Sequence, residues 1–170
     1  MNSTEAMRWR AMTASDLAAV VELAARIHPN YPERAEVLSE KFRLFPEGCF
    51  TLAEASAIHG YCLSHPWVVG APPSLDTFLG ALPKRPDSYF IHDLTVDRAM
   101  RRRNLAAKLM PELALAARTT GLSHMTLVAV NGSVPFWSRM GFRQTADEAT
   151  QSSARVKYDA DAVHMERNLK

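Results

Sequence analysis

Three arginines between a strand-like and a helix-like segment form the most chemically informative feature of the sequence. Arg101, Arg102 and Arg103 follow the apolar run that ends at Val96, and a helical apolar pattern begins near Leu105. The first turn of a helix has unpartnered backbone N–H groups and partial positive charge, and guanidinium groups bind phosphate in bidentate fashion. The arrangement predicts a pyrophosphate-binding turn, although three adjacent arginines alone would favour a solvated turn or a nucleic-acid patch.

The residues after the arginines suit close approach of the backbone to an anion. Such approach requires small side chains or residues that tolerate unusual dihedral angles. Ala106 and Ala107 are small, and Asn104 is one of the few non-glycine residues that adopts a left-handed conformation. We therefore expect the segment from Asn104 through Leu105 to Ala107 to contact the phosphates.

Two motifs resemble those of the GNAT superfamily of N-acetyltransferases. Arg101-x-x-Asn104-x-Ala106, after Leu94-Thr95-Val96, is similar to the acetyl-CoA signature Arg/Gln-x-x-Gly-x-Gly/Ala. The segment 131–142, with the sequence NGSVPFWSRMGF, resembles the family's Asn…Phe-Tyr-x-x-x-Gly-Phe. Both motifs occur in the family's order and separation, over residues 92–142, with Asn104 in place of glycine and Trp137 in place of tyrosine.

The resemblance implies an α/β (α+β) fold in a single domain over residues 1–170. We expect a twisted, mixed but mostly antiparallel sheet, splayed between Tyr89–Val96 and Ser123–Val130, with helices on both faces. It also implies acetyl-CoA as cosubstrate, with pantetheine pairing with Leu94, Thr95 and Val96 like an added strand. Asn131 is expected to bind pantetheine amides, and Phe136 and Trp137 are assigned to the same site, although the spacing of Phe136 also suits the core.

His92 and Asp93 are the predicted catalytic residues. A histidine of ordinary pKa is mostly neutral at neutral pH and accepts a proton, and Ile91-His92-x-Leu94-x-Val96 resembles the histidine-bearing strand of the arylalkylamine N-acetyltransferases. A structural histidine is an equally good interpretation. Asp93 points to the opposite face from His92 unless the strand is bulged. It could bind a substrate ammonium or pair with an arginine, and a structural role is slightly favoured.

The function that the resemblance implies is transfer of acetyl from acetyl-CoA to a primary amine of a small molecule, by direct attack in a ternary complex. Tyrosine often protonates the departing thiolate in this family, whereas the indole N–H of Trp137 is no useful acid. Water, Ser133 or Ser138 could supply that proton. Two alternatives stay open: a protein or peptide N-acetyltransferase, and a CoA-binding sensor or interaction module without turnover, which the Trp137 replacement favours.

Composition constrains partners and location. The chain has 170 residues, 47% hydrophobic and 22% charged, and a net charge of +2, which is ordinary for a globular protein and points to neither nucleic acid nor a membrane surface. No apolar run reaches a spanning length. The six histidines show no metal-ligand spacing, so no metal is expected. Two cysteines favour free thiols and a cytoplasmic setting, and a monomer or a homodimer is equally compatible.

Several local expectations follow from the pattern outside the motifs. A hairpin is predicted around Ala55 and Ser56. The Pro-rich segment His65–Ser88 is expected to form an ordered flap against the acceptor pocket, with a short helix at Leu75–Leu82, or a plain packing loop. Pro111 predicts a kink in a helix that begins near Asn104. Residues 146–161 are expected to be a mobile excursion.

Overall fold

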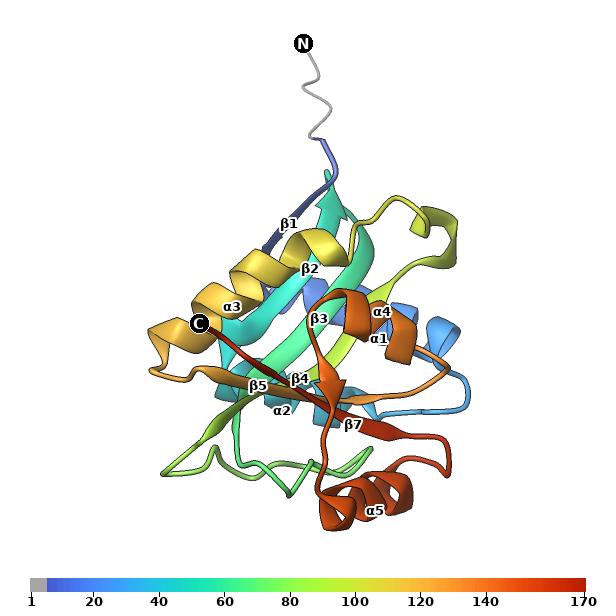
Figure 1. The fold of residues 1–170 in the computed structure, drawn as a ribbon. Coiled ribbons are helices and arrows are strands. Elements are labelled where there is room, and N and C mark those ends of the chain that lie inside the picture. The colour runs from blue at the N-terminus through green and yellow to red at the C-terminus, as the bar shows by residue number, and fades with distance from the viewer. Residues whose placement is uncertain (1–5) are drawn as a thin grey trace.

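The computed structural model describes residues 6–170 and confirms the predicted sheet. Seven strands are arranged in the order β1-β2-β3-β4-β5-β7-β6, and all neighbouring pairs are antiparallel except β4 and β5 (Figure 1). The strands are β1 (Arg8–Ala11), β2 (Cys49–Glu54), β3 (Ala57–Trp67), β4 (Ser88–Val96), β5 (His124–Ala129), β6 (Arg143–Gln144) and β7 (Val163–Asn168).

Helices cover both faces of the sheet, as expected. They are α1 (Leu17–Ile27), α2 (Ala35–Leu44), α3 (Met110–Thr119), α4 (Val134–Arg139) and α5 (Glu148–Lys157). Because side chains alternate along β3, Tyr61 and Leu63 pack with α1 and α2, while Cys62 joins the core formed with α3. Figure 1 shows these helices on opposite sides of the sheet. The predicted hairpin is present, and both cysteines are buried free thiols.

The sheet splays between β4 and β5 because β4 is bulged at His92. β4 pairs in parallel with β5 only over Tyr89–Ile91, opposite Met125–Leu127. On its other side, Asp93 faces Leu63 and Ile91 faces Ser64, which leaves His92 as the extra residue. A bulge bends its strand and increases the local twist. The C-terminal half of β4 therefore diverges from β5 and leaves a gap at the edge where the predicted motifs lie.

Three local predictions were wrong. Residues 148–157 form the regular helix α5, in which Asp147 caps the first turn by accepting the Thr150 N–H, so this segment is not a mobile excursion. Pro111 lies in the first turn of α3, after a 3₁₀ turn at Ala107–Leu109, where a missing N–H disturbs no helical bond, so the predicted kink does not occur.

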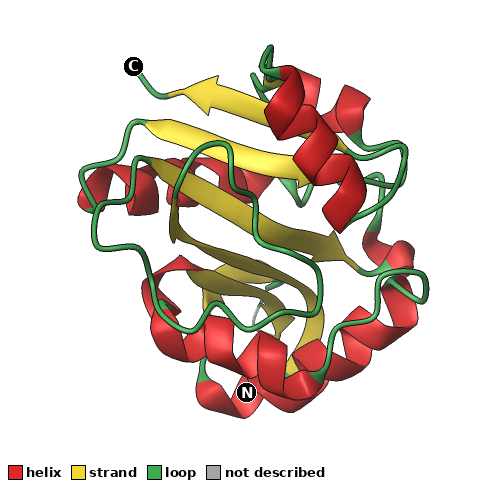
Figure 2. Ribbon diagram, turned by 90° about the horizontal axis from the view of Figure 1, so that it is seen from below, coloured by secondary structure: helices red, strands yellow, loops and turns green. Residues whose placement is uncertain are grey.

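The third error is the short helix predicted at Leu75–Leu82. The flap comprises residues 68–87, between β3 and β4, and contains no helix. The flap crosses the open end of the sheet (Figure 2). Carboxylates of the α2 region hold it: Glu40 accepts the N–H groups of Leu79 and Gly80, and Glu33 accepts that of Asp76. The segment is therefore ordered by tertiary contacts to α2 and not by its own secondary structure.

Candidate active site

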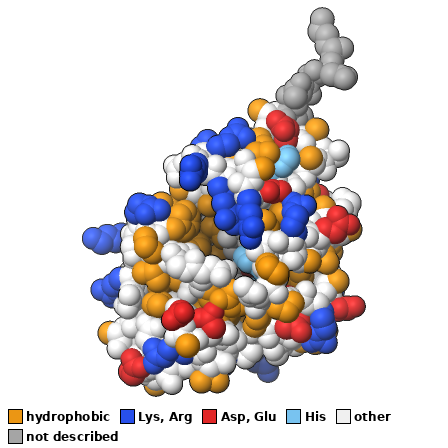
Figure 3. Space-filling model, turned by 90° about the vertical axis from the view of Figure 1, so that its right-hand side faces the viewer, with side chains coloured by type: hydrophobic (Ala, Val, Ile, Leu, Met, Phe, Trp, Pro, Cys, Tyr) orange, Lys and Arg blue, Asp and Glu red, His pale blue; other side chains and the backbone are white. Residues whose placement is uncertain are grey.

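A pocket of about 620 Å³ occupies the splay between β4 and β5. It is lined by β4, the turn after it, β5, α4, the α1–α2 connection and Leu75 of the flap. Figure 3 shows a hollow with basic side chains gathered on its rim and apolar side chains inside it. His92, Asp93 and every residue predicted to bind the coenzyme line this pocket, except Arg103.

The turn after β4 has the backbone that the phosphate prediction requires. Asn104 adopts φ 56°, as expected from its tolerance of the left-handed region, and Arg102 adopts φ 67°, which the sequence did not indicate. The indole N–H of Trp9 donates to the carbonyl oxygen of Leu105 at 2.7 Å and ties the turn to β1. With the small side chains of Ala106 and Ala107, this turn fits a pyrophosphate.

Arg103 was assigned to the coenzyme site, but it lies outside the pocket. Its guanidinium contacts the sulfur atoms of Met100 at 3.3 Å and Met7 at 3.9 Å. Successive side chains in an irregular turn point in different directions, so three adjacent arginines do not share one target. Arg101 and Arg102 remain the pocket's basic residues on this turn.

The opposite wall of the pocket is aromatic. Trp137 is 7% exposed, and its ring packs edge-on against Phe136 at 5.0 Å and Phe142 at 5.4 Å between centroids. Asn131 connects β5 to α4 with φ 56° and also lines the pocket. Trp137 therefore fills a packed position beside the gap.

His92 belongs to a buried cluster with Glu33 and Lys41. Its Nε2 lies 3.2 Å from Oε1 of Glu33, and Oε2 of Glu33 lies 3.6 Å from Nζ of Lys41, whose side chain is 1% exposed. Burial alone would raise the pKa of Glu33, but the charges of His92 and Lys41 outweigh it and lower this pKa to about 2. Glu33 is therefore ionised at neutral pH and fixes the orientation of the His92 ring.

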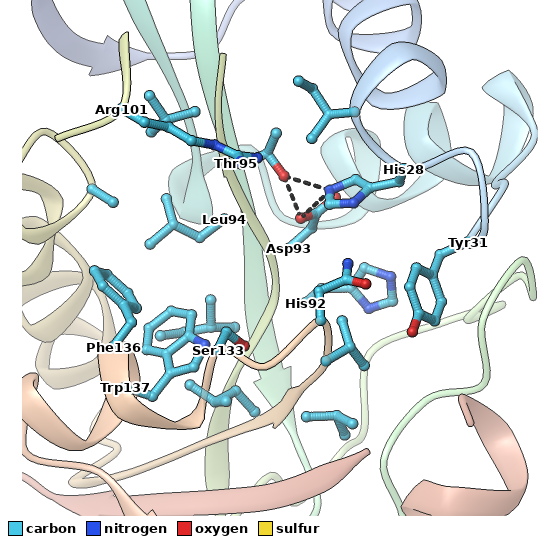
Figure 4. Close-up of a pocket in the computed structure, with 18 of the residues that line it drawn as sticks. His28, Tyr31, His92, Asp93, Leu94, Thr95, Arg101, Ser133, Phe136 and Trp137 are labelled. Atoms are coloured by element: carbon cyan, nitrogen blue, oxygen red, sulfur yellow. Dashed lines mark hydrogen bonds and ion pairs between the residues drawn. The ribbon is translucent and has the colours of Figure 1, made fainter. Parts of the chain in front are cut away.

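Asp93 belongs to a second cluster, which centres on a histidine that sequence reasoning missed. Oδ1 of Asp93 accepts from the hydroxyl of Thr95 at 2.8 Å, and Oδ2 accepts from Tyr61. Nε2 of His28 lies 2.6 Å from Oγ1 of Thr95 and 3.4 Å from Oδ1 of Asp93. Figure 4 shows His28 reaching from the end of α1 to these two residues of β4.

Both carboxylate–histidine pairs line one pocket because of the β4 bulge. A regular strand would send adjacent residues to opposite faces, whereas the extra residue lets His92 meet Glu33 and Asp93 meet His28, both from the α1–α2 region. His28 follows the last residue of α1 and precedes Pro29, a position that signals a helix end in the sequence. Nothing in that signal indicates that the chain returns there to β4.

Comparison with known families agrees with this geometry. Residues 76–166 match the model of the acetyltransferase (GNAT) domain. The chain is a member of the GNAT superfamily. GNAT enzymes are acyl-CoA-dependent acyltransferases, and this chain is one of them. No curated protein matches the sequence significantly. The finer resemblance to arylalkylamine N-acetyltransferases stays a prediction.

Solved GNAT-like structures share the fold at low sequence identity. The GNAT-like decarboxylase GphF, in complex with isobutyryl-CoA, has a TM-score of 0.75 at 20% identity, over 96% of this chain and 100% of that one. Ard1 of Thermoplasma volcanium has a TM-score of 0.71 at 16% identity, over 97% of this chain and 99% of that one. Rv2747 of Mycobacterium tuberculosis, solved with CoA, has a TM-score of 0.66 at 14% identity, over 95% of this chain and 99% of that one.

Among residues 6–170, no helix is long and apolar enough to cross a membrane. Within the same range, histidine, cysteine and carboxylate side chains form no group of three that could hold a metal ion.

Proposed function

We propose that this enzyme transfers the acetyl group of acetyl-CoA to a primary amine of a small molecule, by direct attack in a complex that holds both substrates. The observation that carries this proposal is the continuity of one pocket. It runs from the turn at Arg101, past the gap between β4 and β5, to the histidine–carboxylate pairs next to the flap. Its volume of about 620 Å³ is in the range of small-molecule sites.

His92 is proposed to accept the proton of the amine. An alkylammonium has a pKa near 10.4, so roughly one molecule in a few thousand is uncharged at neutral pH. Because Nε2 of His92 faces Glu33, its Nδ1, which has no hydrogen-bond partner among the described residues, is the atom that takes the proton, directly or through water. The amine nitrogen then bonds to the carbonyl carbon, the C–S bond breaks, and sulfur leaves with the electron pair.

The pocket's lining supports a small amine with an apolar or aromatic body. Glu33 and Asp93 offer negative charge for the ammonium, and Tyr31, Tyr158 and Leu75 offer apolar surface. Leu75 of the flap lines this end, which supports a small acceptor more than a protein chain. One relative, the NatC complex, was solved with a Gag peptide and CoA, so peptides belong among the acceptors to be tested.

The test is release of free thiol from acetyl-CoA with a panel of arylalkylamines, polyamines, aminoglycosides, amino acids and short peptides. We expect turnover with small amines that lack a carboxylate. Turnover with peptides alone would contradict the small-molecule acceptor. No thiol release with any amine, together with acetyl-CoA binding in a thermal-shift assay, would contradict the acetyl transfer that we propose.

Arg101 and Arg103 form a matched pair for the coenzyme half of the site. Arg101→Ala removes a basic side chain from the pocket, and we expect the KM for acetyl-CoA to rise about tenfold, as for loss of a charge-assisted contact. Arg103→Ala removes the same charge two residues away, outside the pocket, and should change this KM less than about twofold. Equal effects of the two variants would contradict the assignment of Arg101.

A further inference from the structure

The reaction needs a proton for the departing sulfur, and the residue expected to supply it is replaced. The chain has Trp137 where the resemblance predicts a tyrosine, and an indole N–H does not ionise in the useful range. Trp137 is moreover packed between Phe136 and Phe142. The proton must therefore come from another group that lines the pocket or from water.

His28 lines the same pocket and is held by two residues of β4. The Thr95 hydroxyl donates to Asp93, so the oxygen of Thr95 accepts the Nε2–H of His28 at 2.6 Å. Asp93 adds a second acceptor for that hydrogen at 3.4 Å. The Nε2 proton is thus retained in both charge states, and the Nδ1 proton is the one that an imidazolium could give away.

The position of His28 along the pocket corresponds to the sulfur and not to the amine. In a thioester, the sulfur lies between the pantetheine chain and the carbonyl carbon, so it faces the end of the pocket that holds the phosphates. Thr95, which His28 contacts, lies along β4 between the base proposed at His92 and the turn at Arg101 (Figure 4). Three residues of strand separate Thr95 from His92, about 10 Å, so the two histidines meet different parts of the reacting complex.

We propose that His28 is the general acid that protonates the departing CoA thiolate. This inference rests on the acetyl transfer proposed above. As the C–S bond breaks, the electron pair stays on sulfur and the Nδ1 proton of His28 moves to it, which gives the free thiol and neutral His28. An ammonium substrate loses two N–H protons as it becomes an amide, of which His92 takes one and water takes the other. Exchange with solvent returns both residues to their starting states, so protons balance over one turnover.

The charges around His28 suit an acid. Burial lowers the pKa of His28, but the hydrogen bond and the charge of Asp93, with the charge of Glu33, outweigh burial and the opposing charge of Arg101, so the net pKa is raised above 6.5. A larger fraction of His28 is therefore charged at neutral pH. Its proton still moves favourably to a thiolate, whose conjugate acid has a pKa of about 8.5. Histidines in two environments can thus divide acid and base roles.

The experiment compares four proteins: the wild type, His28→Gln, and His28→Gln combined with either Trp137→Tyr or Trp137→Phe. Thiol release is measured with the best amine from the panel, at pH 6–9, with thermal unfolding as a control for folding. His28→Gln should lower kcat about 100-fold at pH 7 and leave the KM for acetyl-CoA within about twofold. It should also abolish the fall of kcat on the alkaline side, where His28 loses its proton.

The two double variants separate proton donation from positioning. Tyrosine at position 137 places a phenol where the family resemblance has one, so His28→Gln/Trp137→Tyr should regain at least about tenfold in kcat. Phenylalanine fills similar space without a hydroxyl and should regain nothing. Equal activity of the two double variants, or a kcat of His28→Gln within about threefold of the wild type, would overturn the assignment of His28.

Two further outcomes keep the proposals distinguishable. Absence of thiol release by the wild type with every amine would overturn the proposed function and this assignment together. Wild-type activity that His28→Gln does not change would overturn only the assignment of His28 as the acid. If His28→Gln fails to fold, Asp93→Asn is the second variant. Loss of that carboxylate should lower the pKa of His28 and move the alkaline limb of kcat to lower pH by about one unit, and an unmoved limb would overturn the proposal.

Discussion

The two histidine–carboxylate pairs of the pocket contain the same residue types in different surroundings. The side chains of His92 and Glu33 are 1% and 8% exposed, whereas those of His28 and Asp93 are 21% and 17% exposed. The first pair is completed by the buried cation of Lys41. The second is completed by the hydroxyl groups of Thr95 and Tyr61.

This difference shows how surroundings divide roles between identical groups. Glu33 lies beside the cation of Lys41 and the Nε2 atom of His92 and also accepts an N–H of the flap, so its charge helps to hold the site together. Asp93 is held by neutral donors and faces a histidine that reaches the open part of the pocket. Glu33 therefore stays charged and orients the His92 ring, while the His28–Asp93 pair is more open to solvent.

The largest expected effect comes from breaking the buried pair. Glu33→Gln leaves Lys41 and His92 without their shared carboxylate, and we expect the free energy of unfolding to fall by about 3 kcal/mol. Asp93→Asn keeps an oxygen that can accept from Thr95 and Tyr61, and the loss should be about 1 kcal/mol. Urea denaturation of both variants measures the difference, and equal losses would show that burial does not separate the two pairs.

The next effect concerns activity. His92→Gln removes the proposed base, and we expect kcat to fall about 100-fold at pH 7 with little change in the KM for acetyl-CoA. The matched control is His124→Gln on β5, since His124 pairs with Glu166 away from the pocket. Similar kcat values for both variants, with intact folding by circular dichroism, would leave His92 only a structural role.

The smallest effect is the pH dependence of stability, which should have opposite directions for the two pairs. The pKa of Glu33 is lowered to about 2, so its stabilisation is present above about pH 4.5 and is lost as pH falls. The pKa of His28 is raised, so its stabilisation is full below about pH 6.5 and is lost as pH rises through the folded-state value.

Unfolding free energies of the wild type, Glu33→Gln and His28→Gln at pH 3–9 measure this contrast. The unfolding free energy of Glu33→Gln should approach that of the wild type only at acidic pH. That of His28→Gln should approach it only at alkaline pH. The difference in unfolding free energy between His28→Gln and the wild type should stay below about 1 kcal/mol, because the surroundings of His28 are partly exposed. A difference for His28→Gln that grows with pH would contradict the pairing with Asp93.

Much of the coenzyme half of the site could be predicted from local sequence. Strand β4, the left-handed conformation of Asn104 and the position of α4 follow from residue types and spacing over about 50 residues. The errors nearby have local causes too. Pro111 was read as an interior helix residue although the helix begins at Met110, and α5 was missed because its polar sequence gives a weak apolar pattern.

The acceptor half could not be predicted, because its contacts join residues far apart in the chain. Glu33 meets His92 across 59 residues, and His28 meets Thr95 across 67. The flap follows no helical or strand pattern of its own, and Glu33 and Glu40 accept three of its backbone N–H groups. The bulge that lets His92 and Asp93 serve one pocket depends on the register with β3.

By itself, the sequence determined the fold class and predicted a basic turn and a histidine at one edge of β4, because each depends on residue types at short spacing. Only the tertiary structure decided which carboxylate lies beside each histidine, that Arg103 lies outside the pocket, and that His28 lines it. These outcomes depend on strand register and on where the chain returns, and on burial, which sets the charge state of each pair.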